Sequence, residues 1–208
     1  MCAICICYIA PSYAVEYGSV SKESSSVDYS SVDINKALKN ADLYFNLALK
    51  EQDENLKSEY MKKAEYEYNK IYLVKYDDIH SAIQLGRIYD YQKQDRYAKS
   101  YFSRALGLNY RNPYVNYYIA NFYYDRKDYK KALRYYRKAM DYGIKEDIEL
   151  LSKMGDIFEK FGDLRRANIC YKRAFLADPA NEDIPDKIRE MEEINYNPAG
   201  YYDRRNTK

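Results

Sequence analysis

The sequence LGRIY at positions 85–89, followed by Ala98, Phe102 and Ala105, decides how this chain folds. Two later stretches repeat it in the same order: Ile119-Ala120-x-x-Tyr123 with Ala132, Tyr136 and Ala139, and Met154-Gly155-x-x-Phe158 with Ala167, Tyr171 and Ala174. The small residue moves from position 86 to 120 to 155, which is a period of 34 and then 35 residues. A unit of this length cannot bury its apolar face alone, so neighbouring units must stack. The sequence therefore predicts an all-α, elongated stack of repeats.

The spacing within each unit predicts a helical hairpin. A small residue in the first helix (Gly86) and an Ala in the second (Ala98) allow the two backbones to approach closely. Large rings such as those of Tyr89 and Phe102 then fill the space around that contact. The chain has only seven Gly and five Pro in 208 residues, which also favours long helices over a β fold.

This pattern resembles the tetratricopeptide repeat (TPR) family, whose motif places Trp, Leu, Gly, Tyr, Ala, Phe, Ala and Pro through a 34-residue helical hairpin. The resemblance covers hairpins at 79–112, 113–146 and 148–181, and less closely one at about 41–78. The family's early Trp is replaced by Tyr44, Ala82, Asn116 and Leu151, and its closing Pro is present only as Pro179. The resemblance implies a right-handed superhelical α-solenoid of about four hairpins over residues 35–194.

The first hairpin matches the motif least well. We expect Asp33 to cap its first helix, because a carboxylate can accept from the free N–H groups of a first turn. The stretch Tyr44-x-x-Leu47-Ala48 imitates the later repeats, and Ala64, Tyr68 and Ile71 imitate their second helices, which predicts a helix from about Leu56 to Val74. Ala48 and Ala64 are sixteen positions apart, against twelve for Gly86 and Ala98, so we expect about four extra residues in the turn or at the helix ends.

Residues 182–194 predict the C-terminal capping helix that a repeat stack needs over its last apolar face. Ile188, Met191 and Ile194 lie on one side of this segment and acidic residues on the other. The polar residues 195–208 predict a flexible tail.

The N-terminus reads as an export segment. Residues 2–15 are uncharged and mostly apolar, are too few to span a bilayer, and carry small residues at the places for cleavage after Ala14. A basic segment before the apolar run is missing, so either the true start lies upstream or the run is not a signal peptide. We therefore expect a signal-peptide-like segment at 1–14 and a Ser-rich linker at 15–34, with a secreted or periplasmic location if the segment is a signal and a cytoplasmic one otherwise. No stable membrane anchor is expected.

The composition limits the partners. The chain has 34 basic and 32 acidic side chains, so its net charge of +2 provides no global field to recruit nucleic acid or an anionic membrane. The 28 Tyr, against six Phe and no Trp, suit half-buried helix surfaces and adaptable binding faces, although a coding bias towards Tyr, Lys and Asn explains the excess equally well.

The resemblance to the family also implies a binding site, because the first helices of successive hairpins line a concave groove in that family. The groove positions carried over to this sequence are His80, Ile83, Arg87, Asp90, Tyr91, Tyr114, Tyr117, Asn121, Tyr124, Asp125, Ser152, Asp156 and Lys160, together with the acidic Glu149 and Glu159. Aromatic rings beside polar groups are typical of interaction hot spots. The alternative is that several of these Tyr rings only pack between helices. Asn121 fits one position of the family's carboxylate-binding clamp, but Glu149 would repel a carboxylate and argues against such a clamp.

Other kinds of site find little support in the sequence. His80 is the only histidine and has no ligand-spaced Cys or carboxylate around it, and the cysteines do not follow a metal-binding pattern, so we expect no metal and no cofactor. The basic stretch 126–138 has interleaved Tyr rings and could contact phosphates and bases, but Ala132, Tyr136 and Ala139 within it are packing positions, which turns its charges outward. No phosphate-binding loop, nucleophile elbow or second histidine suggests catalysis or a small-molecule substrate.

The sequence thus predicts a non-catalytic scaffold or adaptor that binds a protein or peptide in its groove and is exported. The alternatives are an intracellular interaction module and a nucleic-acid-binding repeat protein. Partner identity and oligomeric state are left open by the sequence.

Overall fold

The computed structural model describes residues 32–196, so the predictions for the export segment, most of the linker and the tail lie outside the described residues. The described part of the chain is helical and contains no strand. Its helices are α1 (Ile34–Lys50), α2 (Glu54–Val74), α3 (Ile79–Tyr91), α4 (Asp95–Leu108), α5 (Pro113–Asp125), α6 (Tyr129–Tyr142), α7 (Ile148–Lys160), α8 (Leu164–Ala177) and α9 (Asp183–Tyr196).

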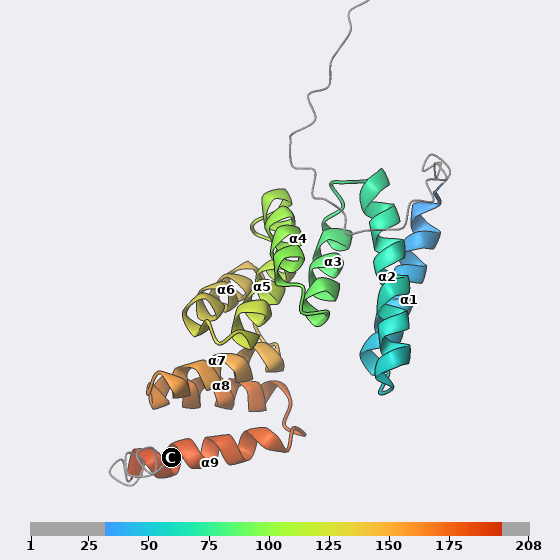
Figure 1. The fold of residues 1–208 in the computed structure, drawn as a ribbon. Helices are drawn as coiled ribbons and strands as arrows, with labels where there is room; N and C mark the ends of the chain where they lie inside the picture. Colours follow the sequence, from blue (N-terminus) through green and yellow to red (C-terminus); the bar gives the residue numbers. More distant parts are fainter. Residues whose placement is uncertain (1–31, 197–208) are drawn as a thin grey trace, which may run out of the picture.

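The helices pack as successive hairpins, as the repeat predicts. Each odd-numbered helix from α1 to α7 packs against the helix that follows it, and the hairpins follow one another in chain order with α9 beside α8 (Figure 1). The fold is therefore an all-α solenoid. None of the helices between residues 32 and 196 is long and apolar enough to cross a membrane.

Helix starts are set by short polar side chains. The side chains of Asp33, Asp53, Asp78, Asn112, Asp128, Asp147 and Asp163 accept hydrogen bonds from backbone N–H groups of the first turn of their helices. These N-caps satisfy donors that have no partner inside the helix. The expected cap at Asp33 is confirmed, with its carboxylate 3.0 Å from the backbone nitrogen of Lys36.

The repeated small and large residues pack against each other inside each hairpin. Gly86 faces the ring of Phe102, and a β-carbon added at Gly86 would lie 2.6 Å from that ring. Gly155 faces Tyr171 in the same way, at 2.5 Å. The paired Ala residues of the second helices, Ala98, Ala132 and Ala167, are fully buried. The predicted packing role of these residues is confirmed.

The first hairpin differs from the other three. Its helices have 17 and 21 residues, against 13 and 14 in α3 and α4. Tyr68 donates to Asp42, as Tyr171 of the last hairpin donates to Asp156 just after Gly155. Ala41 is therefore the small residue of the first hairpin, and the hairpin starts at Ile34, seven residues before the predicted range 41–78.

The register predicted for Ala48 is thus wrong by two helical turns. Ala41 and Ala48 lie seven residues apart on one face of α1 and are both fully buried, so periodicity alone cannot choose between them. Relative to α3 and α4, α1 is four residues longer and α2 seven residues longer, which places the additional length in the helices themselves.

Helix α9 covers α8 at the C-terminal end of the stack. Met191 is fully buried and Ile184 is buried, while Ile188 is half-buried against the same core. Lys187 reaches back to α7, where its Nζ lies 3.2 Å from Asp156 Oδ1. The side chain of Ile194 lies outside the described residues.

Candidate functional site

The structure forms a hollow between the first helices of three hairpins. It has a volume of about 260 Å³ and combines three cations, three carboxylates and four aromatic rings. Its lining residues are Arg87, Asp90, Tyr91 and Lys93 near α3, Phe102 of α4, Tyr117, Tyr118, Asn121 and Asp125 of α5, and Glu149 and Lys153 of α7. The hollow therefore lies where the family resemblance places the groove.

Seven of the predicted groove residues line this hollow: Arg87, Asp90, Tyr91, Tyr117, Asn121, Asp125 and Glu149. Tyr114 is 57% exposed near the start of α5, and Lys160 is exposed at the end of α7. Ser152 is half-buried on α7. Ile83 is only 6% exposed and packs in the hydrophobic core, so it offers almost no surface to a ligand. These four residues are not part of the hollow.

His80 joins the first two hairpins instead of lining the hollow. Its Nε2 lies 3.0 Å from Asp42 Oδ1 on α1, and Asp42 also accepts the hydroxyl of Tyr68. Its ring packs beside the Tyr68 ring, with 6.0 Å between the centroids. Among residues 32–196, no group of His, Cys, Asp or Glu is placed to hold a metal ion.

Arg87 lies at the centre of the part of the hollow between α3 and α5. Its guanidinium carbon is 4.5 Å from the ring centroid of Phe45 and 4.2 Å from that of Tyr118, so it is held between two rings. Its Nη1 donates to Gln84 Oε1 at 2.8 Å. No carboxylate in the described part of the chain forms an ion pair with Arg87. This cation is positioned by the fold but left without an anion.

The position of Arg87 follows from a change in the repeat. In the hairpins where the large ring belongs to Tyr136 or Tyr171, the residue after the small one accepts the ring's hydroxyl, namely Asn121 at 2.5 Å or Asp156 at 2.7 Å. In the second hairpin the ring is Phe102, which has no hydroxyl. The equivalent residue, Arg87, therefore has no ring hydroxyl to bind in its hairpin, and its side chain lines the hollow.

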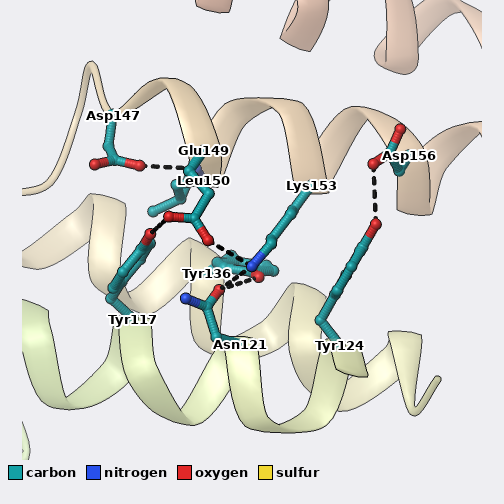
Figure 2. Close-up of polar contacts among 9 residues, drawn as sticks. All are labelled: Tyr117, Asn121, Tyr124, Tyr136, Asp147, Glu149, Leu150, Lys153 and Asp156. Carbon is teal, nitrogen blue, oxygen red and sulfur yellow. Dashed lines mark hydrogen bonds and ion pairs between the residues drawn. The ribbon is translucent and has the colours of Figure 1, made fainter. Parts of the chain in front are cut away.

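The part of the groove between α5 and α7 is closed by internal hydrogen bonds (Figure 2). Tyr117 donates to Glu149 at 2.6 Å, and Tyr124 donates to Asp156 at 2.9 Å. Lys153 Nζ contacts Glu149 at 2.6 Å. The same ammonium group lies 3.2 Å from Asn121 Oδ1. The polar atoms of this part are thus already paired with one another.

These contacts shift the pKa values of the groups involved. Burial, with the neighbouring Glu149, raises the pKa of Tyr117, and burial, with Asp156, raises that of Tyr124, so both hydroxyls stay protonated donors. Burial alone would raise the pKa of Glu149, but hydrogen bonds from Lys153 and Tyr117 outweigh it and hold that pKa below its ordinary value.

At the other end of the hollow, Arg126 joins two hairpins. Its Nη1 lies 2.8 Å from Asp90 Oδ1, and its Nε donates to Asp95 Oδ2 at 2.8 Å. Burial still raises the pKa of Asp90, whereas the hydrogen bond from Arg126 lowers that of Asp95. Arg126, one of the basic residues of the 126–138 stretch, therefore has a structural role.

Sequence reasoning missed several residues of the hollow, including Tyr118, Lys153, Lys93 and Phe102. Lys153 could have been found from its spacing, because it lies four residues after Glu149 on a predicted helix. At this spacing an acidic and a basic side chain can form an ion pair. Tyr118 could not have been found, since it directly follows Tyr117 and only the three-dimensional packing shows which of the two rings meets Arg87.

No protein-family model and no curated protein matches this sequence. Solved structures do resemble its fold. MamA has a TM-score of 0.57 and 14% identity over 79% of this chain and 89% of its own. PilF of Pseudomonas aeruginosa has a TM-score of 0.63 and 17% identity over 80% of this chain and 75% of its own. The TPR domain of Arabidopsis OM64 has a TM-score of 0.50 and 17% identity over 55% of this chain and 94% of its own.

The chain has a tetratricopeptide-repeat fold. The expectation based on the repeated residues is confirmed at the level of the fold class, an all-α solenoid of TPR hairpins. Identities below 20% limit the comparison to the fold, so the partner must be argued from the residues of this chain.

Proposed function

We propose that this TPR chain is a non-catalytic scaffold that binds a protein or peptide segment in the part of its groove between α3 and α5. The observation that carries the proposal is Arg87, a half-buried cation held between Phe45 and Tyr118 without a carboxylate partner in the described part of the chain. A partner that supplies an acidic side chain would give this cation its ion pair in a partly desolvated site, where such pairs are stronger than in water.

Exposed rings on α3 and α5 support the same location. Tyr91 is 50% exposed and lines the hollow, and Tyr114 is 57% exposed on the facing helix α5. Large rings that keep a polar tip are favoured anchors at protein interfaces. The α5–α7 part offers less, because the hydroxyls of Tyr117 and Tyr124 are already donated to α7.

Affinity capture from extracts of the native organism, with the folded chain as bait, tests this proposal. Tyr91→Ala combined with Tyr114→Ala should lose the captured partner, because both changes remove exposed rings, and should leave the circular-dichroism spectrum unchanged. The matched control is Tyr66→Ala with Tyr110→Ala, since these rings are 61% and 59% exposed and lie outside the hollow. Capture that survives the first pair, or is lost equally with the control pair, contradicts binding in the groove.

A second arm of the proposal concerns location. We propose that residues 1–14 direct export and that the mature chain begins at Val15, because the apolar run ends in small residues suited to cleavage. Mass spectrometry of the N-terminal peptide from native material tests it. An N-terminus at Val15 supports export, while a retained Met1 supports the intracellular alternative.

A further inference from the structure

Three turns of the solenoid carry the same unusual charge. The turns between α3 and α4, α5 and α6, and α7 and α8 each place two exposed cations on the surface. These residues, which we call the turn edge, are Lys93, Arg96, Lys127, Lys130, Lys160 and Arg165. None of them forms an ion pair within residues 32–196, although the chain as a whole is close to neutral.

Three acids beside these turns bond to groups outside the turn edge. Asp128 accepts from the backbone nitrogen and the Nζ of Lys131, and Asp163 accepts from the backbone nitrogen and the Nε of Arg166. Asp95 is bound by Arg126. The direct bonds of these three acids are therefore made to groups other than the six cations of the turn edge, while the exposed Asp125, two residues before Lys127, reduces the local positive charge.

The three turns succeed one another along one side of the solenoid. Arg126, which follows α5, contacts Asp90 and Asp95 on either side of the first turn. Tyr124, near the end of α5, contacts Asp156 one turn before the end of α7. These contacts hold the second turn next to both the first and the third, so the six cations form one continuous strip.

At five of these positions the local backbone disfavours the residue found there, for one of two reasons. Lys93 and Lys127 both have φ = 59°, a conformation that costs energy for a residue with a β-carbon, and the equivalent residue of the third turn is Gly162 at φ = 78°. Arg96, Lys130 and Arg165 are the second residues of their helices, where the helix dipole favours acids over bases. A preference against positive charge is thus broken three times, at Arg96, Lys130 and Arg165, which indicates a functional surface.

We propose that the turn edge, which shares only Lys93 with the hollow, binds an anionic phospholipid surface. Lipid headgroups supply the complementary negative charge, and each Lys or Arg near such a surface strengthens binding about fivefold. An apolar wedge is also present, because Phe161 is 48% exposed in the third turn beside Lys160. A single-stranded nucleic acid fits less well, since the rings near the strip are taken: Tyr97 packs on Tyr89 and Tyr129 on Tyr124.

Co-sedimentation of the full chain with vesicles tests the proposal. Vesicles of phosphatidylcholine containing about one third phosphatidylglycerol should bind the chain, and pure phosphatidylcholine vesicles should bind it far less. The variant Arg96→Glu, Lys130→Glu, Arg165→Glu should bind the anionic vesicles roughly 100-fold more weakly. The same changes place acids in first helical turns, so the variant should melt at the same temperature or higher. Weak binding therefore cannot be attributed to unfolding.

A control variant separates a localised strip from general charge. Lys36→Glu, Lys39→Glu, Lys62→Glu changes the net charge by the same amount at exposed residues that form no ion pair within the described chain. It should retain binding within a few-fold of the wild type. Equal losses in the two variants would overturn the proposal, because binding would then follow net charge.

Two further probes distinguish the source of the anions. A thirty-nucleotide oligothymidylate and polyglutamate carry dense negative charge without a bilayer.

The apolar contact is tested separately. Phe161→Ser should weaken vesicle binding several-fold at high salt, where the charges are screened and the apolar contact remains. No binding to anionic vesicles, or tighter binding to either linear polyanion than to vesicles, would overturn a membrane surface as the ligand. Loss of vesicle binding with intact capture of the groove partner would leave the proposed scaffold function standing.

Discussion

The two parts of the groove are built from equivalent helices but differ in how they use their polar side chains. Between α5 and α7, Tyr117, Tyr124 and Lys153 bond to Glu149 and Asp156, so the helices are joined by side-chain hydrogen bonds (Figure 2). Between α3 and α5, the central group is the unpaired Arg87. Two changes in sequence underlie the difference: Phe102 lacks the hydroxyl that Tyr136 and Tyr171 carry, and α3 has Ile83 and Asp90 where α5 has Tyr117 and Tyr124.

This difference teaches that a tyrosine-rich groove is not everywhere a binding surface. A buried hydroxyl must find a partner, and in the α5–α7 part it finds one on the neighbouring hairpin. Groove residues of the same kind therefore have different roles in the two parts. Tyr117 and Tyr124 join neighbouring hairpins, whereas Tyr91 remains exposed for a ligand.

The largest effect is expected from removing Asp156, the hydrogen-bond acceptor of the α5–α7 part, which we call the closed part; the α3–α5 part is the open part. Asp156 accepts from Tyr124 and Tyr171 and pairs with Lys187, so Asp156→Ala leaves buried donors unsatisfied. We expect the free energy of unfolding in urea to fall by about 2 kcal/mol. Asp125→Ala, at an exposed carboxylate that lines the open part, should change it by less than about 0.5 kcal/mol. Similar losses for the two variants would show that the parts are equally interlocked.

The next effect concerns how firmly each large ring is held. Gly86→Ala and Gly155→Ala both push a β-carbon into a ring. Tyr171 is anchored by Asp156 at 2.7 Å and Glu159 at 3.1 Å, whereas Phe102 has no hydrogen bond to resist a shift. Gly155→Ala should therefore lower the free energy of unfolding, measured by thermal melting, by about 1 kcal/mol. Gly86→Ala should lower it by less than half of that, since Ala also improves helix propensity. A larger loss for Gly86→Ala would contradict the anchoring role of the tyrosine hydroxyl.

The fold was predictable from the sequence because packing residues repeat. The Gly or Ala and the ring that faces it recur at 34–35 residues, and each hairpin obeys the same steric rule. The register of α1 was not predictable, because Ala41 and Ala48 satisfy the same periodicity and only the contact between Tyr68 and Asp42 separates them.

The site was predictable only in outline. Positions on the first helices could be assigned, and seven of them line the hollow, but periodicity does not report which side chains pair across hairpins. The bond between Tyr117 and Glu149 joins residues 32 positions apart on different helices. Whether such a pair forms depends on the distance and rotation between neighbouring hairpins, which are set by the whole interface.

The smallest expected effect is the pH dependence of the closed part. The pKa of Glu149 lies below its ordinary value of 4.5 in the folded chain, so its contribution to stability is complete above that value and is lost as the pH falls through the folded pKa. The carboxylate is about half exposed, so the contribution is of the order of 0.5 kcal/mol. Glu149→Gln should therefore lower stability at pH 7 by about that amount and, in urea titrations, should converge with the wild type once the pH has fallen below the folded pKa of Glu149. Arg87 forms no ion pair within residues 32–196, but its charge is one of the smaller causes that lower the pKa of Glu149, so Arg87→Gln should change the acid limb of the stability curve less than Glu149→Gln does. A larger change of that limb in Arg87→Gln than in Glu149→Gln would mean that Arg87 itself is paired with a carboxylate in the folded chain.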